Sequence, residues 1–253
     1  MNVYISVVSH GHYDFIKNLN VLNNLNEKFT VIIKDNLCDN NLQKYCKENS
    51  LNYIDTEAGL GFGANNNRVF LYCKNILGMK SNDIFIVLNP DVIINADDIE
   101  RVSKKISSGF DLVGINLYKD EGFSVYDNSV RYYPTLLSFF KSFIGMGNNT
   151  IIDKGSISSD IRVDWFAGSF MAFKASHYEK LSGFDEGYFM YCEDIDICHR
   201  SRLIGKSAIY SPDIKAVHKA QHKNRNIFTK HFLWHVKSSL RFLIKKNLAR
   251  YNK

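Results

Sequence analysis

The first half of the chain alternates short apolar runs with segments of helical periodicity. Continuous apolar runs, typical of strands buried on both faces, occur at residues 3–8, 29–36, 51–56, 83–91 and 110–118. Between them, residues 13–25, 63–77 and 96–106 place apolar side chains every three or four positions, as an amphipathic helix does. This order predicts an α/β fold, with a Rossmann-like, mostly parallel central sheet flanked by helices.

The second half is less regular. Residues 163–174 and 207–218 predict further strands, and residues 145–160 are polar and glycine-rich, which predicts a loop. Residues 226–248 predict one long helix. No linker or repeat interrupts the pattern, so we expect one domain over residues 1–223 and a helical extension of it over residues 224–253.

Charge changes the picture of this C-terminal helix. Residues 214–253 contain eleven Lys and Arg and no acid, so in a chain of net charge +6 the first 213 residues carry −5. On the predicted helix, basic residues share one face: Lys230, Lys237, Arg241 and Lys245. A basic amphipathic helix suits an anionic membrane surface, and a helix docked on the core with a solvated basic edge is the alternative. The acidic body and the lack of a reading motif argue against nucleic acid.

Cysteine usage bears on the compartment. The five cysteines are odd in number and lack zinc-finger spacing, and the sequence opens directly on a strand-like run. These features predict an intracellular protein with reduced thiols. No apolar run approaches the ~20 residues that span a bilayer.

Polar residues follow several predicted strands. Ligands of parallel sheets bind beyond the carboxyl ends of the strands, and there the chain places Ser9, His10, Asp35, Asn36, Asn89 and Asp91. A carboxylate such as Asp91 suits Mg²⁺ or Mn²⁺, although Asn89 and the following proline also fit an ordinary turn. His218 would complete a metal site if it lay near Asp91, and would otherwise be a hydrogen-bonded surface residue.

Residues 59–64, GLGFGA, match the G-x-G-x-x-A dinucleotide fingerprint. That fingerprint requires an acid about 20 residues on, at the carboxyl end of the next strand. Asp83 precedes its strand, and Asp91 lies 27 residues past Ala64. A dinucleotide-dependent oxidoreductase is therefore disfavoured against a loop whose backbone approaches another nucleotide.

Residues 183–200, GFDEGYFMYCEDIDICHR, place five carboxylates beside apolar side chains. One acid would satisfy the dipole of a helix that begins near Glu193, but three fall within four residues. On a helix Glu193 and Asp196 share a face, whereas Asp194 points elsewhere. Like charges this close raise one another's pKa, which improves a carboxylate as a base. The pattern alone leaves structural and catalytic roles open.

In order and spacing, the motifs resemble the inverting family 2 glycosyltransferases with the GT-A fold. The resemblance covers residues 3–218 and rests on VYISVVSHGH, VIIKDN, GFGANNN, IVLNPDV, WFAGSFM, the acidic stretch and YSPDIKAVH. Residues 218–235 resemble bacterial rhamnosyltransferases of O-antigen assembly. Those enzymes move L-rhamnose from dTDP-L-rhamnose to N-acetylglucosamine on a polyprenyl diphosphate.

The resemblance implies a role for each matching residue. Asp194 stands at the position of the family's catalytic base, with Glu193 beside it. The implied nucleotide-binding residues are Ser9, His10, Asp35, which would contact the base, Asn36, Gly61, Gly63, Asn67 and Asn89. Trp165, Gly168 and Arg225 would border the sugar and the acceptor. Asp91 and His218 would hold Mg²⁺ or Mn²⁺, and because Asn89 replaces the first acid of the family's D-x-D motif, only Asp91 offers a full carboxylate there.

The implied partners are dTDP-rhamnose, a polyprenyl-diphosphate-linked sugar acceptor and the membrane surface. The implied location is the cytoplasm, peripheral to the inner face of the cell membrane. A family 2 enzyme using a UDP- or GDP-sugar remains the main alternative. A sugar-nucleotide-binding protein without catalysis is disfavoured, because such a protein has no need of the acids Asp91, Glu193 and Asp194.

Overall fold

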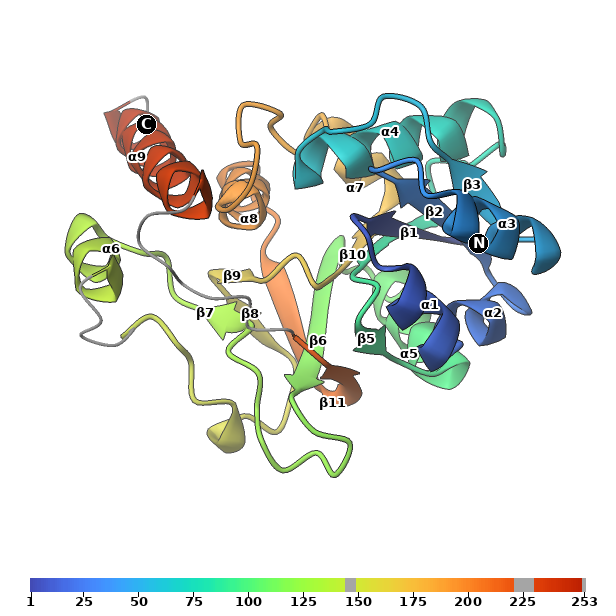
Figure 1. Cartoon of the computed structure of the whole chain (residues 1–253). Helices are drawn as coiled ribbons and strands as arrows, with labels where there is room; N and C mark the ends of the chain where they lie inside the picture. The colour runs from blue at the N-terminus through green and yellow to red at the C-terminus, as the bar shows by residue number, and fades with distance from the viewer. Residues whose placement is uncertain (144–148, 221–229, 252–253) are drawn as a thin grey trace.

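The computed structural model describes residues 1–143, 149–220 and 230–251. Its main sheet has the order β3-β2-β1-β4-β10-β6-β11-β5, with β8 pairing on β11 (Figure 1). The strands of this sheet are β1 (Val3–Ser9), β2 (Thr30–Asp35), β3 (Asn52–Ile54), β4 (Ile84–Leu88), β5 (Val92–Ile93), β6 (Leu112–Tyr118), β8 (Ile161–Val163), β10 (Phe170–Lys174) and β11 (Ala208–His218). A second, two-stranded sheet pairs β7 (Val130–Arg131) with β9 (Trp165–Phe166).

Strand direction agrees with the predicted fold class. β3, β2, β1 and β4 are mutually parallel, and β6 is parallel to β11. β10 lies between β4 and β6 and is antiparallel to both, so β4 and β6 run in the same direction. The edge strands β5 and β8 pair antiparallel with β11. The expected α/β fold with a mostly parallel sheet is confirmed.

Helices cover both faces of the sheet because its strands alternate their apolar side chains between two cores. In β4, Phe85 and Val87 enter one core, whereas Ile84 and Ile86 enter the other. The first core is covered by α4 (Phe62–Asn75), α6 (Leu136–Phe143), α7 (Ala175–Lys180), α8 (Glu193–Leu203) and α9 (Lys230–Tyr251). The second is covered by α1 (Tyr13–Leu19), α2 (Val21–Asn26), α3 (Asn40–Glu48) and α5 (Ala96–Ser107).

The structure departs from the periodicity in three places. The helix expected over residues 13–25 splits at Asn20, whose left-handed backbone (φ 53°) ends α1 and begins α2. The strand expected over residues 163–174 breaks around Gly168 and is shared between two sheets. The short strands expected over residues 207–218 form one strand, β11, with an irregularity between Ser211 and Lys215.

Helix α9 docks on the body beside α8 (Figure 1). Phe242 is fully buried in the same core as α8. Two residues of the predicted basic face form ion pairs with the body of the protein. Arg241 and Lys245 pair with Asp185 at 2.9 and 2.7 Å, and Lys245 also pairs with Asp196 at 2.6 Å. Among the described residues, no helix is long and apolar enough to cross a membrane.

The outward arc of α9 is aliphatic. At helical spacing it exposes Leu233, Leu240, Ile244 and Leu248, and the charged residues Lys230 and Lys237 lie among them. The start of the predicted helix, residues 226–229, and the boundary placed at residue 223 lie outside the described residues. The division into residues 1–223 and 224–253 therefore stays a prediction.

Candidate active site

The carboxyl ends of β1, β2 and β4 meet at one edge of the sheet, as parallel strands require. The Asn36 amide donates to the Ser9 carbonyl oxygen at 2.9 Å, which joins the loops after β1 and β2. The Asn89 amide donates to the Ser169 carbonyl oxygen at 3.0 Å, which joins the end of β4 to the start of β10. The structure thus brings the polar residues after these strands together, and adds residues 168–169 to them.

Asp35 shapes the loop that follows β2. Its carboxylate is buried and accepts hydrogen bonds from the Leu37 amide (2.9 Å), the Asp39 amide (2.6 Å) and the Tyr53 hydroxyl (2.9 Å). These bonds fix the turn against which the nucleobase of a bound nucleotide would lie. The direct contact with a base that the sequence suggested stays a prediction.

Asn36 joins this loop to the glycine-rich segment. Its side chain both donates to the Leu60 carbonyl oxygen (2.9 Å) and accepts from the Leu60 amide (3.0 Å). The same side-chain nitrogen lies 3.3 Å from His10 Nδ1. His10, Asn36 and the start of α4 therefore form one continuous wall, as the nucleotide-binding interpretation requires.

The glycines of the GFGANNN motif allow close packing at the start of α4. A Cβ on Gly61 would lie 2.2 Å from the Phe189 carbonyl oxygen, and one on Gly63 would lie 2.7 Å from Phe184 Cβ. α4 is thereby pressed against residues 184–189, the segment that leads into the acidic helix α8. The role of these glycines at a nucleotide stays a prediction.

Asn67 has a structural role that the sequence did not reveal. Its side chain accepts from the Tyr178 hydroxyl (2.8 Å) and the Phe184 amide (2.9 Å), and donates to the Phe184 carbonyl oxygen (2.9 Å). With these bonds made, Asn67 fixes the loop around residue 184. Any contribution to nucleotide binding that the sequence predicted for it is left untested.

Asp91 and His218 come together at the end of β4. His218 Nε2 lies 3.4 Å from Asp91 Oδ1, which is buried and has no hydrogen-bond partner. On its other side, His218 Nδ1 lies 3.1 Å from Asp127 Oδ2. Burial lowers the pKa of His218, but the hydrogen bond of Asp127 and the charges of Asp91 and Asp127 outweigh it and raise the pKa to about 9.

These residues fit a divalent cation. The Asp91 oxygen, which accepts no hydrogen bond, faces the His218 imidazole, and both are ordinary ligands of such ions once the imidazole gives up its proton. Within the described ranges no cluster of three or more His, Cys, Asp or Glu could hold a metal. A site with two protein ligands suits Mg²⁺ or Mn²⁺, since such ions take further ligands from water and substrate phosphates.

Asp127 is a member of this site that the sequence did not reveal. It lies in the loop after β6, where its amide donates to the Leu117 carbonyl oxygen at 2.9 Å. A carboxylate on Nδ1 fixes the orientation of an imidazole and directs Nε2 toward the ligand. No local motif surrounds residue 127, because the pairing depends on β11 lying beside β6.

The acids of α8 divide into two kinds. Asp196 is buried and ion-paired, at 2.6 Å from Arg200 Nε and 2.6 Å from Lys245 Nζ. Asp194 is half-buried, and its carboxylate accepts from the Ile195 amide (2.8 Å) and the Gly168 amide (3.2 Å). No cation pairs with Asp194 among the ion pairs of the described residues at 4.0 Å or less. Asp194 thus differs from Asp196 in having no counter-ion, and its role as the base stays a prediction.

Glu193 and Asp194 are adjacent carboxyl groups whose charges interact. Burial, together with the charge of Asp194, raises the pKa of Glu193 to about 8, and one of its oxygens has no hydrogen-bond partner. Burial also raises the pKa of Asp194, against the opposing effect of its backbone hydrogen bonds and of Arg131. The charge of Asp194 opposes the ionisation of Glu193, which favours the protonated form of Glu193 at neutral pH.

Glu193→Gln should flatten the pH dependence of stability. Unfolded, the Glu193 carboxyl ionises near 4.5, whereas the folded chain holds the proton up to about pH 8. Between these values the folded state binds the extra proton, so the free energy of unfolding falls as pH rises. Gln has no proton to lose, so the melting temperature of wild type should fall relative to the variant between about pH 5 and pH 8. Thermal unfolding across that range measures it, and parallel curves would contradict the assignment.

Gly168 contacts the proposed base, and Trp165 lies in β9, which packs against α8. The Trp165 indole N–H donates to the Tyr132 carbonyl oxygen at 2.9 Å, and the Arg131 guanidinium lies 5.4 Å from the indole ring. Arg131, whose charge acts on Asp194, was not singled out from the sequence, because its strand β7 reaches the site only through the small second sheet. Arg225, predicted at the acceptor, lies outside the described residues.

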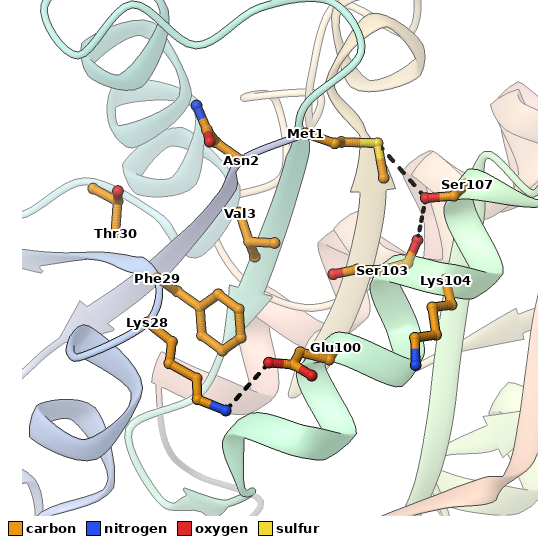
Figure 2. Close-up of a pocket in the computed structure, with 10 residues that line it drawn as sticks. All are labelled: Met1, Asn2, Val3, Lys28, Phe29, Thr30, Glu100, Ser103, Lys104 and Ser107. Atoms are coloured by element: carbon orange, nitrogen blue, oxygen red, sulfur yellow. Dashed lines mark hydrogen bonds and ion pairs between the residues drawn. The ribbon is translucent and has the colours of Figure 1, made fainter.

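A hollow elsewhere on the sheet is not part of this site. Figure 2 shows it at the amino ends of β1 and β2, where Val3 and Thr30 line it and Lys28 pairs with Glu100 at 3.2 Å. None of the predicted site residues lines it. It lies at the edge of the strands opposite to Asp91 and Asp35, so we do not assign it to substrate.

Comparison with known proteins places this geometry in a family. The rhamnosyltransferase WbbL of Escherichia coli K12 is 43% identical over 251 residues, which cover 97% of this chain and 94% of that protein. This chain belongs to the same family of glycosyltransferases. The enzyme is also 28% identical over 202 residues to the N-acetylglucosaminyl-diphospho-decaprenol L-rhamnosyltransferase of Mycobacterium tuberculosis, covering 75% of this chain and 66% of that one. No protein-family model matches the sequence of this chain.

Solved structures support the fold of the glycosyltransferase. The mannosyltransferase PcManGT of Pyrobaculum calidifontis, in complex with GDP-Man and Mn²⁺, matches with a TM-score of 0.59 at 14% identity. The match covers 88% of this chain and 58% of that chain. At this identity the likeness concerns the fold, and it agrees with the GT-A architecture expected from the ordered motifs.

Proposed function

We propose that this enzyme transfers L-rhamnose from dTDP-L-rhamnose to N-acetylglucosamine on a polyprenyl diphosphate, with inversion at the anomeric carbon. The relatives with rhamnosyltransferase names support the donor sugar, and the mycobacterial one supports the acceptor class. The observation that carries the mechanism is Asp194, a half-buried carboxylate held by the Gly168 amide at the substrate edge of the sheet.

Asp194 acts as the general base. Its oxygen takes the proton of an acceptor hydroxyl while that hydroxyl oxygen attacks the anomeric carbon from the face opposite the departing nucleotide. The proton ends on Asp194, the new bond is the glycosidic C–O bond, and the bond to the nucleotide diphosphate breaks. The raised pKa of Asp194 makes it a stronger base than an ordinary aspartate.

The opposite end of the site would receive the diphosphate. Asp91 and His218, with Asn89 nearby, would hold Mg²⁺ or Mn²⁺, which supplies a Lewis acid for the charge that develops on the leaving group. Asp127 keeps the imidazole of His218 directed at Asp91. The nucleoside would lie along the wall formed by Ser9, His10, Asp35 and Asn36, and against the start of α4 at Gly61 and Gly63. Trp165, Gly168 and Arg225 would face the sugar and the acceptor.

A donor panel tests the proposed chemistry. Purified enzyme is given dTDP-rhamnose, UDP-N-acetylglucosamine, UDP-galactose or GDP-mannose, a lipid-diphosphate-N-acetylglucosamine acceptor, and either Mg²⁺, Mn²⁺ or a chelator. We expect transfer from dTDP-rhamnose alone and its loss with the chelator. Transfer from a UDP- or GDP-sugar in its place would overturn the donor assignment but leave the glycosyltransferase assignment intact.

Asp91→Ala should weaken the binding of nucleotide in the presence of metal. The change removes the one carboxylate at the end of β4 and leaves His218 and Asn89. Isothermal titration of dTDP with and without Mg²⁺ should show that the metal strengthens binding to wild type but not to the variant. Asp97→Ala, at an exposed carboxylate of α5, is the matched control and should titrate as wild type. An unchanged effect of Mg²⁺ in Asp91→Ala would exclude Asp91 as a ligand.

We also propose that the enzyme is peripheral to the membrane through the outward arc of α9. The acceptor lipid lies in a bilayer, and the exposed aliphatic residues Leu240 and Ile244 suit its interfacial region. The C-terminal 40 residues carry eleven basic and no acidic residues, which complements an anionic leaflet. Arg241 and Lys245 form ion pairs with the body of the protein. Insertion of the apolar side chains should therefore contribute more to membrane binding than the charges of these two residues do.

Leu240→Ser with Ile244→Ser should therefore reduce sedimentation with vesicles. We expect wild type to bind vesicles of neutral phosphatidylcholine, to bind better when anionic phosphatidylglycerol is added, and to keep part of its binding at high salt. Leu71→Ser with Ile76→Ser, two exposed residues at α4, is the matched control. Equal sedimentation of both double variants would reject α9 as the contact, and a change in oligomeric state alone would indicate a second copy as the occupant.

A further inference from the structure

The segment that leads into the proposed base, residues 185–192, is held along its length by α9. Asp185 pairs with Arg241 and Lys245 at 2.9 and 2.7 Å. A Cβ on the next glycine, Gly187, would lie 2.3 Å from the Arg241 guanidinium, so the helix side chain lies directly on the backbone there. The first part of the segment is therefore tied to the second half of α9.

The second part of the segment is tied to the first half of α9. The rings of Phe189 and Trp234 lie 4.7 Å apart, and the Ser238 hydroxyl donates to the Met190 carbonyl oxygen at 2.9 Å. The Tyr191 hydroxyl lies 3.1 Å from a ring nitrogen of His231. These contacts hold three successive residues of the segment, one of them by its backbone carbonyl, so they restrain the path of the backbone and not only one side chain.

The backbone at the end of this segment is strained. Tyr191 and Cys192 have φ values of 71° and 65°, in the left-handed region that residues with a Cβ seldom occupy. Such a residue persists only where the surroundings hold it. Two of them directly before Glu193 set the direction in which α8 starts, and so set where the Asp194 carboxylate lies.

α9 also holds the first turn of α8 beyond the base. Lys245 pairs with Asp196, two residues after Asp194, as well as with Asp185. One ammonium group thus joins the residues before and after the base. Asp194 itself contacts the Gly168 amide from the other side, so a shift of α8 would change its place at the substrate edge.

We propose that α9 is a positioning element of the active site: its inner face fixes residues 185–192 and the first turn of α8, and thereby the place of the base. The inference rests on the proposed role of Asp194 as base. Loosening α9 should lower kcat far more than it weakens the binding of the donor nucleotide, most of whose proposed contacts lie in the loops after β1, β2 and β4.

The test uses the full chain with Trp234→Leu and Lys245→Met combined, compared with Trp234→Phe and Lys245→Arg combined. The first pair removes the ring contact and the double ion pair, and the second keeps an aromatic ring and a positive charge. Asn247→Ala, at an exposed position of the same helix, is the control. Rates are measured with whichever donor wild type uses, and amide hydrogen exchange is measured without substrate.

We expect kcat to fall about 10–100-fold in the first pair, since a displacement of about 1 Å at a reacting group has effects of this size. The KM for donor should stay within about twofold of wild type, and the second pair should recover most of kcat. Amides of residues 185–196 should exchange faster, while those of the loop after β2 do not change. Unchanged exchange and kcat, or a fall in donor binding equal to the fall in kcat, would overturn the proposal. Hydrogen exchange is measured without a donor, so its result distinguishes a failure of the positioning proposal from an error in the proposed donor.

Discussion

Asp194→Asn should reduce turnover by about 10²–10⁴-fold, the usual contribution of a general base, while nucleotide binding survives. Asn keeps the shape of the side chain, and its one oxygen can still accept from the Gly168 amide or from the Ile195 amide, which bond to different oxygens of the aspartate. It cannot take the proton of an acceptor hydroxyl. The acceptor oxygen would then attack without losing its proton to the enzyme, which raises the barrier of the transfer step and not of binding.

Single-turnover rates with radiolabelled donor measure this loss, and titration of dTDP measures binding. Glu186→Gln, a change from carboxylate to amide at an exposed position of the same stretch, is the matched control and should keep its rate. A purified Asp194→Asn enzyme with nearly the wild-type rate and normal folding would show that another group accepts the proton.

Asp196→Asn should instead destabilise the fold. Asp196 is 1% exposed and balances both Arg200 and Lys245. Removing its charge leaves the charges of Arg200 and Lys245 without this partner. Because Arg200 and Lys245 are themselves partly exposed, we expect a loss of about 2–3 kcal/mol in the free energy of unfolding. For a chain of this size that corresponds to a fall of about 4–12 °C in melting temperature.

Scanning calorimetry or circular dichroism measures the loss. Asp213→Asn is the matched control, since Asp213 also pairs with two cations, Arg101 and Lys105, but its side chain is 44% exposed. A pair of that kind contributes about 0–1 kcal/mol, so its melting temperature should change little. Equal falls in both variants would mean that burial does not distinguish Asp196.

The strands and most helices could be predicted because apolar periodicity reports burial, and burial decides these elements. The family and the ordered motifs were confirmed by a relative that covers nearly the whole chain. The division at Asn20 was missed because the apolar spacing continues across it, while the break depends on one backbone angle. α3, α6 and α7 were also not predicted.

The site was harder to predict where it depends on contacts between distant segments. Asp91 comes after β4 and His218 is the last residue of β11. Each belongs to a recognisable motif, but neither motif indicates that the two side chains lie 3.4 Å apart. Asp127 and Arg131 carry no local signal, because strand order alone brings them to the site. The basic face of α9 was visible in the sequence, but its pairing with Asp185 and Asp196 required knowing where the helix docks.

The antiparallel strand β10 has a consequence for synthesis of the chain. It covers the free edge of β4, yet it follows β4 by about 80 residues, which a ribosome adds in about 4–16 s. During that time the apolar edge Ile84–Leu88 has no neighbour on that side, and an uncovered edge of this kind invites pairing with other chains. Chains that stall or end before Phe170 would therefore aggregate, and nascent-chain chaperones would determine how much enzyme a cell obtains.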